Sequence, residues 1–345
     1  MRKRLGVVVA AFLYYSGLVA LARWLMQRSG RHLIILNYHR ATGGDLRRHL
    51  SYLHRHYRML HLEEALEELY TTRQERKKNR DRRTPLVLTF DDGYHDNYTH
   101  GFALASELQV PITIFLIPGY IESGDYFWWW EGYRLVRRSK VDEVTIEERT
   151  YHLGKVEERM LLAQAIDKRL RHAKSVAERE KVLQMVREAL AVPTTVTPEE
   201  EGERPMTWAE VRKMEETGWV SFGAHTMHHP ILACLMDPAE LQYEVTECRR
   251  VLEQHLGHRV RTFAYPIGRS EHIGDQTVRA VQEAGYDWAV TTIHGVNTRQ
   301  SDPYRLGRVL GDVSRHWIVM AAETSGIWKF FSPLWQSLVG KGEGV

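Results

Sequence analysis

The sequence has few cysteines, little net charge and no internal repeat, and each absence narrows the possibilities. Its 345 residues include only Cys234 and Cys248, too few for a disulfide scaffold. The 47 lysines and arginines nearly balance the 44 aspartates and glutamates, so we expect no nucleic-acid partner, which would favour a strongly basic chain. Apolar residues make up 43% of the chain. This composition excludes a disordered or polytopic membrane protein and provides for one substantial core.

An apolar stretch without charge covers residues 5–22 and follows the basic residues 2–4. Its 18 residues approach the length of about 20 that a helix needs to cross a bilayer. We favour an uncleaved membrane anchor, with a cleaved signal peptide and a soluble or membrane-surface helix as alternatives. Arg23 and Arg28 follow the stretch, so positive charge flanks both ends and the orientation is not predicted.

From residue 32 onwards, short apolar runs alternate with helical patterns. Helices are predicted at residues 45–57 and 61–69, where apolar residues recur at helical spacing. Strands are predicted at residues 33–36, 86–90, 112–116, 219–223, 262–265 and 288–292. Such alternation predicts parallel strands with helices outside them, and the chain length suits an α/β barrel.

The alternation stops between about residues 131 and 206, which we interpret as a helical insertion in the barrel. The predicted organisation is therefore a hydrophobic segment at 1–31, a barrel domain at 32–315 and an aromatic-rich segment at 316–345. The last segment contains Trp317, Trp328, Phe330, Phe331 and Trp335. It is either a core-packing helix or a segment at a membrane interface. A basic run at residues 73–83 is interpreted as a solvated loop, with contact to anionic lipid or polymer as the alternative.

Two aspartates directly follow a strand, where parallel α/β folds bind their ligands. Asp91 and Asp92 end the run at 86–90, and Gly93 permits a tight turn. Neighbouring carboxylates repel each other unless a cation or a proton lies between them. The alternative interpretation is that the two aspartates only form a turn and cap the helix that follows.

Two histidines follow the predicted strand at 219–223. His225 and His229 are four residues apart, so on a helical turn both imidazoles would face the same side. With Asp92 they make a two-histidine, one-carboxylate set, which is a known catalytic ligand set for zinc and ferrous iron. Asp91 would then act as a general base on water.

These segments resemble a known family. Residues 89–94 (Thr-Phe-Asp-Asp-Gly-Tyr) and 225–230 (His-Thr-Met-His-His-Pro) are similar to two motifs of the polysaccharide deacetylases, also called NodB-homology or carbohydrate esterase family 4 proteins. Residues 37–39 and 263–268 match further motifs. The resemblance extends over residues 33–310, interrupted by the insertion. It implies a distorted (β/α)7 barrel of the NodB type.

The resemblance also implies roles for the motif residues. Asp92, His225 and His229 would bind a divalent metal, and Asp91 would be the base. The family acts on N-acetylated or O-acetylated sugars in polymers such as chitin-like chains, peptidoglycan, exopolysaccharide and xylan. We expect zinc, which suits nitrogen and oxygen ligands and a hydrolytic task, while Co²⁺, Ni²⁺ or Fe²⁺ could take its place.

The sequence departs from the family pattern in two places. Many members have an arginine, just before the proline of the third motif, that pairs with the base. None stands there, and Arg308 is a candidate replacement. Many members have a Leu-x-His motif that provides the general acid. Here Leu310 is followed by Gly311 and Asp312, so His294 becomes our candidate acid.

Three residues near the motifs are expected to contact the substrate, namely His39, Tyr265 and Arg308. His39 also suits a structural role at a strand end. The three tryptophans at residues 128–130 form either a sugar-stacking platform or a packing contact between the insertion and the barrel rim.

The predicted function is metal-dependent removal of N-acetyl groups from an envelope or exported polysaccharide, or from its lipid-linked precursor. The alternatives are O-deacetylation or deformylation of a sugar, and a non-catalytic glycan-binding assembly protein. The chain is expected at the membrane of a bacterial cell envelope, with the barrel outside the cytoplasm. Its oligomeric state is not predicted.

Overall fold

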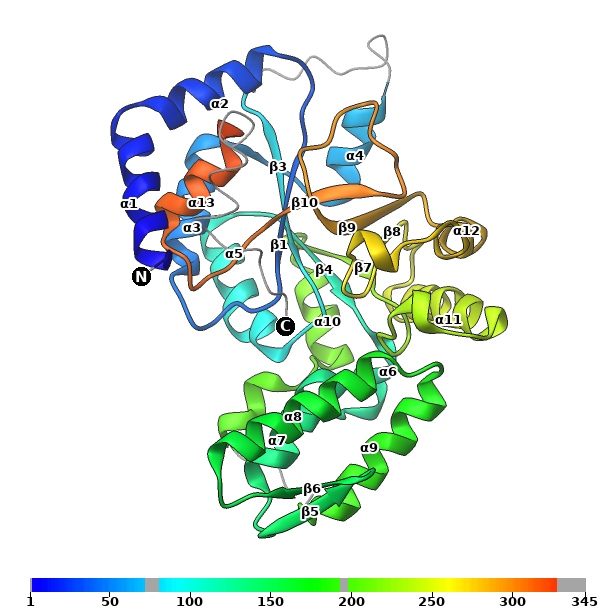
Figure 1. Ribbon diagram of the computed structural model, residues 1–345. Coiled ribbons are helices and arrows are strands. Elements are labelled where there is room, and N and C mark those ends of the chain that lie inside the picture. The colour runs from blue at the N-terminus through cyan, green and yellow to red at the C-terminus, as the bar shows by residue number, and fades with distance from the viewer. Residues whose placement is uncertain (1, 72–80, 193–197, 328–345) are drawn as a thin grey trace.

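Seven parallel strands close into a barrel (Figure 1). The computed structural model describes residues 2–71, 81–192 and 198–327. Around the ring the order is β1–β10–β9–β8–β7–β4–β3, and β3 pairs again with β1. The strands are β1 (Ile34–Tyr38), β3 (Pro85–Phe90), β4 (Ile112–Leu116), β7 (Val220–Ala224), β8 (Thr262–Ala264), β9 (Trp288–His294) and β10 (Leu306–Leu310). The predicted seven-stranded α/β barrel is confirmed.

Helices surround the barrel, and all of them except α13 lie between successive strands. They are α3 (Leu46–His56), α4 (Leu62–Tyr70), α5 (Ala103–Leu108), α6 (Pro118–Ser123), α10 (Trp208–Glu215), α11 (Pro238–Leu256), α12 (Asp275–Glu283) and α13 (Trp317–Thr324). The largest apolar core lies between these helices and the outer faces of the strands. A smaller core joins α4 to side chains that include Ile35, Val87 and Phe115. Both predicted helices, α3 and α4, are present.

Every predicted strand is present within one or two residues, but two strands of this sheet were missed. The short strand β2 (Arg58–Met59) pairs with the first two residues of β3. The last two residues of β3 pair with β4. The other is β10, which closes the barrel between β9 and β1. Gly307 and Arg308 interrupt its apolar run, so the sequence carries no clear strand signal there.

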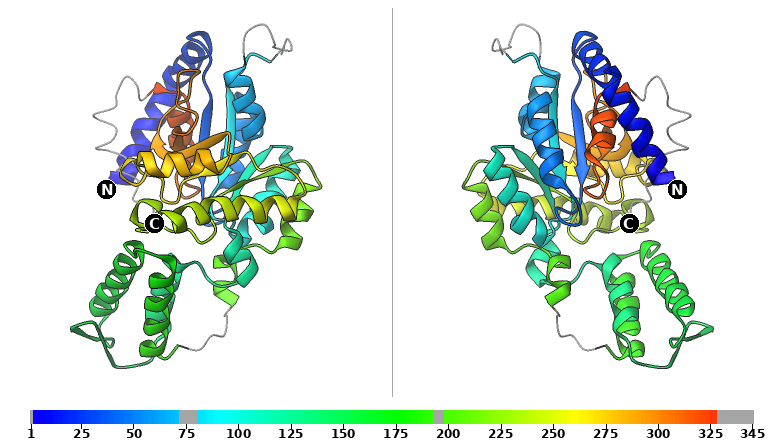
Figure 2. Two further views of the ribbon diagram at one scale, coloured as in Figure 1. Left: turned by 90° about the vertical axis from the view of Figure 1, so that its right-hand side faces the viewer. Right: turned by 90° about the vertical axis from the view of Figure 1, so that its left-hand side faces the viewer.

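The insertion contains a β-hairpin as well as helices, and it supplies most of a second apolar core, which Tyr94, Ile117 and Tyr120 complete from the barrel side. Its elements are α7 (Trp128–Arg138), β5 (Glu143–Ile146), β6 (Arg149–His152), α8 (Val156–Arg171) and α9 (Val176–Leu190). The prediction of helices alone was incomplete, because Val144 and Tyr151 alternate with exposed residues and are buried on one face of the hairpin. Figure 2 shows this unit as a separate lobe beside the barrel.

Two helices at the N-terminus pack along the barrel. They are α1 (Arg2–Tyr15) and α2 (Leu18–Arg28), and they share a small apolar core with α13. No single helix among the described residues is both long and apolar enough to cross a membrane. The two meet that criterion only as a pair, bent by 69° at the break between them. The aromatic residues Trp328, Phe330, Phe331 and Trp335 and most of the basic run at 73–83 lie outside the described residues.

Candidate active site and metal centre

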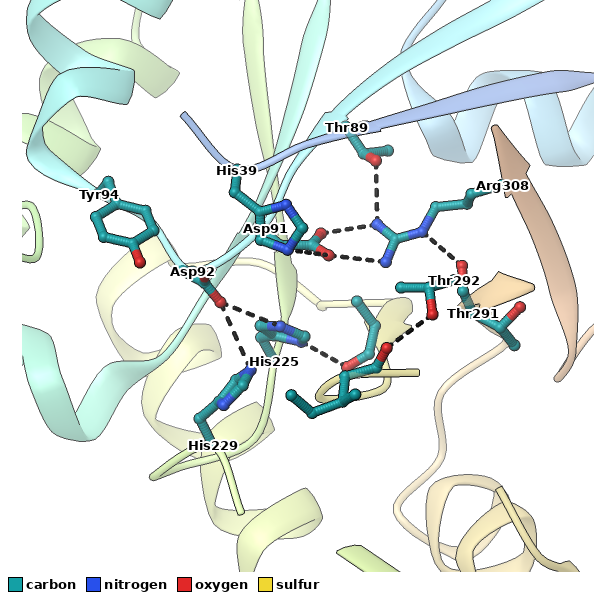
Figure 3. Close-up of polar contacts among 12 residues, drawn as sticks. His39, Thr89, Asp91, Asp92, Tyr94, His225, His229, Thr291, Thr292 and Arg308 are labelled. Atoms are coloured by element: carbon teal, nitrogen blue, oxygen red, sulfur yellow. Dashed lines mark hydrogen bonds and ion pairs between the residues drawn. The ribbon is translucent and has the colours of Figure 1, made fainter. Parts of the chain in front are cut away.

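The two neighbouring aspartates serve different partners (Figure 3). Asp91 continues the direction of β3, and its N–H donates to the carbonyl of Tyr38 at 2.9 Å. Asp92 turns away because its φ is 72°, in the left-handed region, and Gly93 follows with a φ of 72° as well. Asp tolerates that region better than most residues, and Gly adopts it freely. The turn therefore aims the Asp91 side chain at Arg308 and the Asp92 side chain at two histidines.

Asp92, His225 and His229 form a buried group of metal-ligand type. Asp92 Oδ1 lies 3.4 Å from His225 Nε2 and 3.6 Å from His229 Nε2. His225 Nδ1 lies 2.7 Å from the carbonyl oxygen of Ala264. A carbonyl only accepts, so Nδ1 donates to it and Nε2 keeps the lone pair that a metal needs. Burial lowers the pKa of His229 well below its ordinary value, which keeps that imidazole neutral.

These residues fit a divalent cation. Asp92 Oδ1 is buried without a hydrogen-bond partner, and a bare carboxylate oxygen in that position carries a desolvation cost that a cation would offset. The three donor atoms lie within 4.8 Å of one another, which allows one ion at about 2 Å from each. Two imidazoles and one carboxylate suit zinc and other transition metals.

The histidines reach this position without a helix. The helical turn predicted for His225 and His229 does not form, because the segment after β7 is a loop. Thr226 and His229 have φ values of 65° and 55°. The Thr226 hydroxyl accepts from the backbone N–H of His229 at 2.9 Å and so fixes the turn. A left-handed Thr is strained because its side chain is β-branched, and such strain concentrates at functional sites.

Arg308 holds Asp91 in a two-pronged ion pair. Its Nη1 and Nη2 donate to Asp91 Oδ1 and Oδ2, each at 2.7 Å. Its Nε donates to the carbonyl of Thr291 at 2.7 Å, and Nη1 also reaches the Thr89 hydroxyl. Burial acts to raise the pKa of Asp91, but the Arg308 guanidinium, with further contributions from His225 and His39, outweighs burial and the pKa falls to about 2. Asp91 is therefore ionised at neutral pH and able to accept a proton.

The structure distinguishes the remaining candidate residues. His39 follows β1 with 40% of its side chain exposed, and its Nε2 lies 4.0 Å from Asp91 Oδ2. His294 is exposed at the end of β9 and, within the described residues, has no hydrogen bond or ion pair with the aspartates or the metal-site histidines. Tyr265 is buried, and its hydroxyl donates to the carbonyl of Tyr304. That position favours packing over substrate contact. Arg308 is also fully buried, behind Asp91.

The insertion forms one wall of the site. Trp128 is buried, and its indole N–H donates to the carbonyl of His229 at 2.9 Å. The half-buried Trp129 has its ring centroid 4.4 Å from that of His229, and its N–H donates to the Tyr94 hydroxyl at 2.7 Å. The sequence analysis predicted either sugar stacking or packing for these tryptophans. Trp128 takes the packing role, while Trp129 lies against a candidate metal ligand.

Two supporting contacts gave no sequence signal. Arg179 of α9 donates to the carbonyl of His228 at 2.9 Å. His228 Nδ1 lies 2.6 Å from Glu244 Oε1, so this imidazole faces α11 instead of the metal group. Only the folded chain brings these residues together, because they lie on separate elements.

Comparisons with known proteins agree with the fold and the motifs. A sequence profile of the family described as "Polysaccharide deacetylase" matches residues 77–289, well over half of the chain. The chain belongs to the polysaccharide deacetylase family. The matched region contains both aspartates and both metal-site histidines, and it ends before Arg308. YxkH of Bacillus subtilis (strain 168), described as a polysaccharide deacetylase, is 28% identical over 104 residues. That alignment covers 30% of this chain and only 36% of YxkH.

Solved deacetylase structures share the fold over most of the chain. IcaB from Ammonifex degensii has a TM-score of 0.56 at 18% identity, covering 86% of this chain and 98% of its own. The deacetylase PplD from Streptococcus pyogenes has a TM-score of 0.54 at 17% identity, covering 85% and 99%. At these identities the likeness concerns the fold, and the site must be argued from its own geometry.

Proposed function

We propose that this family member removes N-acetyl groups from a carbohydrate by metal-assisted hydrolysis. The observation that carries the proposal is the buried group of Asp92, His225 and His229 with an ionised carboxylate, Asp91, next to it in the chain. A divalent cation bound there supplies Lewis acidity, which polarises the acetyl carbonyl and makes water more acidic. Zinc is the proposed ion, because nitrogen and oxygen ligands and a hydrolytic reaction suit it.

Residues of the chain itself would transfer the protons and bind the sugar. Asp91, oriented by Arg308, takes the proton of the attacking water. His39 delivers a proton to the departing amine, because its Nε2 lies near Asp91 and its side chain is partly exposed. The geometry favours His39 over His294 for this role. Trp129, whose ring lies beside that of His229, is the proposed aromatic contact for an apolar sugar face or the acetyl methyl group.

The proposed substrate is an N-acetylated polysaccharide of a bacterial envelope, an exported polysaccharide, or its lipid-linked precursor. In that setting the barrel lies outside the cytoplasm. O-deacetylation and deformylation use the same activation of water, so only a comparison of substrates separates them from the proposal.

The decisive experiment measures bound metal and acetate release for two neighbouring variants. Asp92→Asn should lose most of the metal and with it the activity. Asp91→Asn should keep the metal, because its ligands remain, and release acetate from an N-acetylglucosamine oligomer about 10²- to 10⁴-fold more slowly, because the group that accepts the proton is lost. Elemental analysis gives the metal content, and an enzymatic acetate assay gives the rate.

Each alternative has its own outcome in this experiment. Equal metal loss in both variants would contradict the division of roles. Faster release from O-acetylated or N-formylated sugars would replace the proposed substrate. Oligosaccharide binding by the metal-loaded wild-type protein without any acyl release would favour the glycan-binding alternative.

A further inference from the structure

The N-terminal helix pair carries an exposed apolar stripe that the barrel does not use. On α1 the exposed large side chains are Leu5, Val8, Phe12 and Tyr15, and on α2 they are Leu18, Leu21, Trp24 and Leu25. Their spacing of three or four residues places them on one face of each helix. The described residues include sixteen exposed large hydrophobic side chains, and half of them belong to this stripe. An apolar patch of this extent marks an interaction site.

The opposite face of the same helices is fixed to the barrel. Ala10 and Leu13 of α1 and Val19 and Ala22 of α2 are buried in a core that they share with α13. Tyr14 packs edge-on against Trp317 with the ring centroids 5.1 Å apart, and Arg23 donates to the Tyr52 hydroxyl of α3 at 3.0 Å. Because these contacts hold both helices along the barrel, the stripe faces outwards on a rigid support.

Neither helix is long enough to cross a bilayer while packed in this way. With 14 and 11 residues, α1 and α2 have lengths of about 21 Å and 16 Å, while the hydrocarbon core is about 30 Å thick. The bend of 69° lies at Ser16 and Gly17, between the two helices. Gly17 has a φ of 81°, which glycine adopts freely. A bent pair with one apolar face is suited to lie along a surface.

The charges near the stripe indicate what it touches. The first 31 residues contain no aspartate or glutamate, but they include six arginines and lysines. The Arg28 guanidinium lies over the Trp24 ring at 4.1 Å from its centroid, a pairing suited to the headgroup layer, where Trp and basic residues concentrate. A symmetric dimer through this face would bring like charges together, whereas anionic headgroups would neutralise them.

We propose that α1 and α2 are a membrane-surface anchor that lies in the plane of an anionic bilayer and holds the barrel by its side. Figure 1 shows the pair along one flank, beside α13 and α3 and away from the insertion lobe α7–α9. Bilayer contact on that flank leaves the carboxyl ends of the strands, where the site lies, uncovered. This inference concerns attachment only and does not depend on the proposed reaction.

Flotation of the full-length protein with lipid vesicles tests the anchor. Vesicles of phosphatidylglycerol and phosphatidylcholine in equal parts should bind the protein, and phosphatidylcholine alone should bind it more weakly because the basic residues gain nothing. Phe12→Ser combined with Leu21→Ser should raise the lipid concentration for half-binding at least about tenfold, since two large apolar contacts are lost. The control, Met160→Ser with Leu161→Ser, changes exposed apolar residues on α8 and should bind like the wild type.

A tag on the N-terminus separates the surface anchor from a span. In sealed vesicles with the barrel outside, a protease should remove the tag if the helices lie in the plane, and a spanning segment would protect it. Protection of the tag, binding unaffected by the Phe12 and Leu21 substitutions, or cleavage of the first residues during export would each overturn the proposal. Lipid-free dimers that the same substitutions dissociate would also overturn it, in favour of a second copy on the stripe.

Discussion

Replacing Arg308 with methionine should destabilise the protein through the charge that it leaves behind. The side chains of Arg308 and Asp91 are 0% and 2% exposed and share two hydrogen bonds of 2.7 Å. Methionine fills much of the same volume, so the main loss is electrostatic. Removing one partner of a buried pair costs about 3–5 kcal/mol. We therefore expect Arg308→Met to lower the free energy of unfolding by about that amount.

The double variant isolates the pair from its surroundings. Asp91→Asn alone leaves the guanidinium buried without its counter-charge, so it too should be costly. Combining it with Arg308→Met removes both charges. The double variant should therefore lose about 2–3 kcal/mol less free energy of unfolding than the sum of the two single variants. Arg305→Met is the matched control, because its pairs with Asp275 and Asp302 lie at the surface and should contribute at most about 1 kcal/mol.

Urea unfolding of the wild type and the four variants provides the measurement. A chelator should be present throughout, so that differences in metal binding do not enter the comparison. Circular dichroism and tryptophan fluorescence must give coincident transitions before one free energy is assigned, since most of a second apolar core lies in the insertion. If the double variant loses as much stability as the two single variants together, within about 0.5 kcal/mol, Asp91 and Arg308 are not coupled. That result would refute the reasoning from the ion pair.

Three further predictions concern the site. His229→Ala should remove most of the bound metal, whereas His228→Ala, whose imidazole faces α11, should retain it in elemental analysis. His39→Gln should lower kcat about 10²-fold or more while metal content is unchanged, and His294→Gln should stay within a factor of a few of the wild type; the reverse ranking would return the acid role to His294. Trp129→Leu should raise KM for acetylated oligosaccharides more than it lowers kcat, because an aromatic contact worth about 0.5–1.5 kcal/mol is lost; an unchanged KM would assign Trp129 to packing.

The sequence located the aspartates and histidines because each group directly follows a predicted strand. A strand followed by chemically reactive residues can be recognised from a short stretch of sequence alone, and this is the case for β3 and for β7. Burial of the group and the approach of Asp92 to both imidazoles depend on left-handed turns, which local propensity does not predict. The helical turn proposed for His225 and His229 failed for this reason.

The roles of more distant residues required the closed barrel. Arg308 lies in a strand whose sequence reads as irregular, and its distance from Asp91 is fixed only when β10 pairs with β9 and β1. Tyr265 belongs to a family-like motif, but the alternation of β8 and the chain after it turn its side chain into the core. The apolar N-terminus has the composition of an anchor, while its bend and its packing on α13 depend on tertiary contacts.

The ion pair between Asp91 and Arg308 also bears on how the protein matures during synthesis. The two residues are 217 positions apart, so the ribosome releases Asp91, Asp92 and both histidines well before β10 exists. A nascent chain at that stage holds every candidate metal ligand but lacks the strand that closes the ring. Asp91 has no guanidinium partner until the last strand inserts, and long-range closure of this kind is slow. The carboxylate proposed as the base is therefore completed last, so the proposed hydrolysis would require that β10 has been made and has paired with its neighbours.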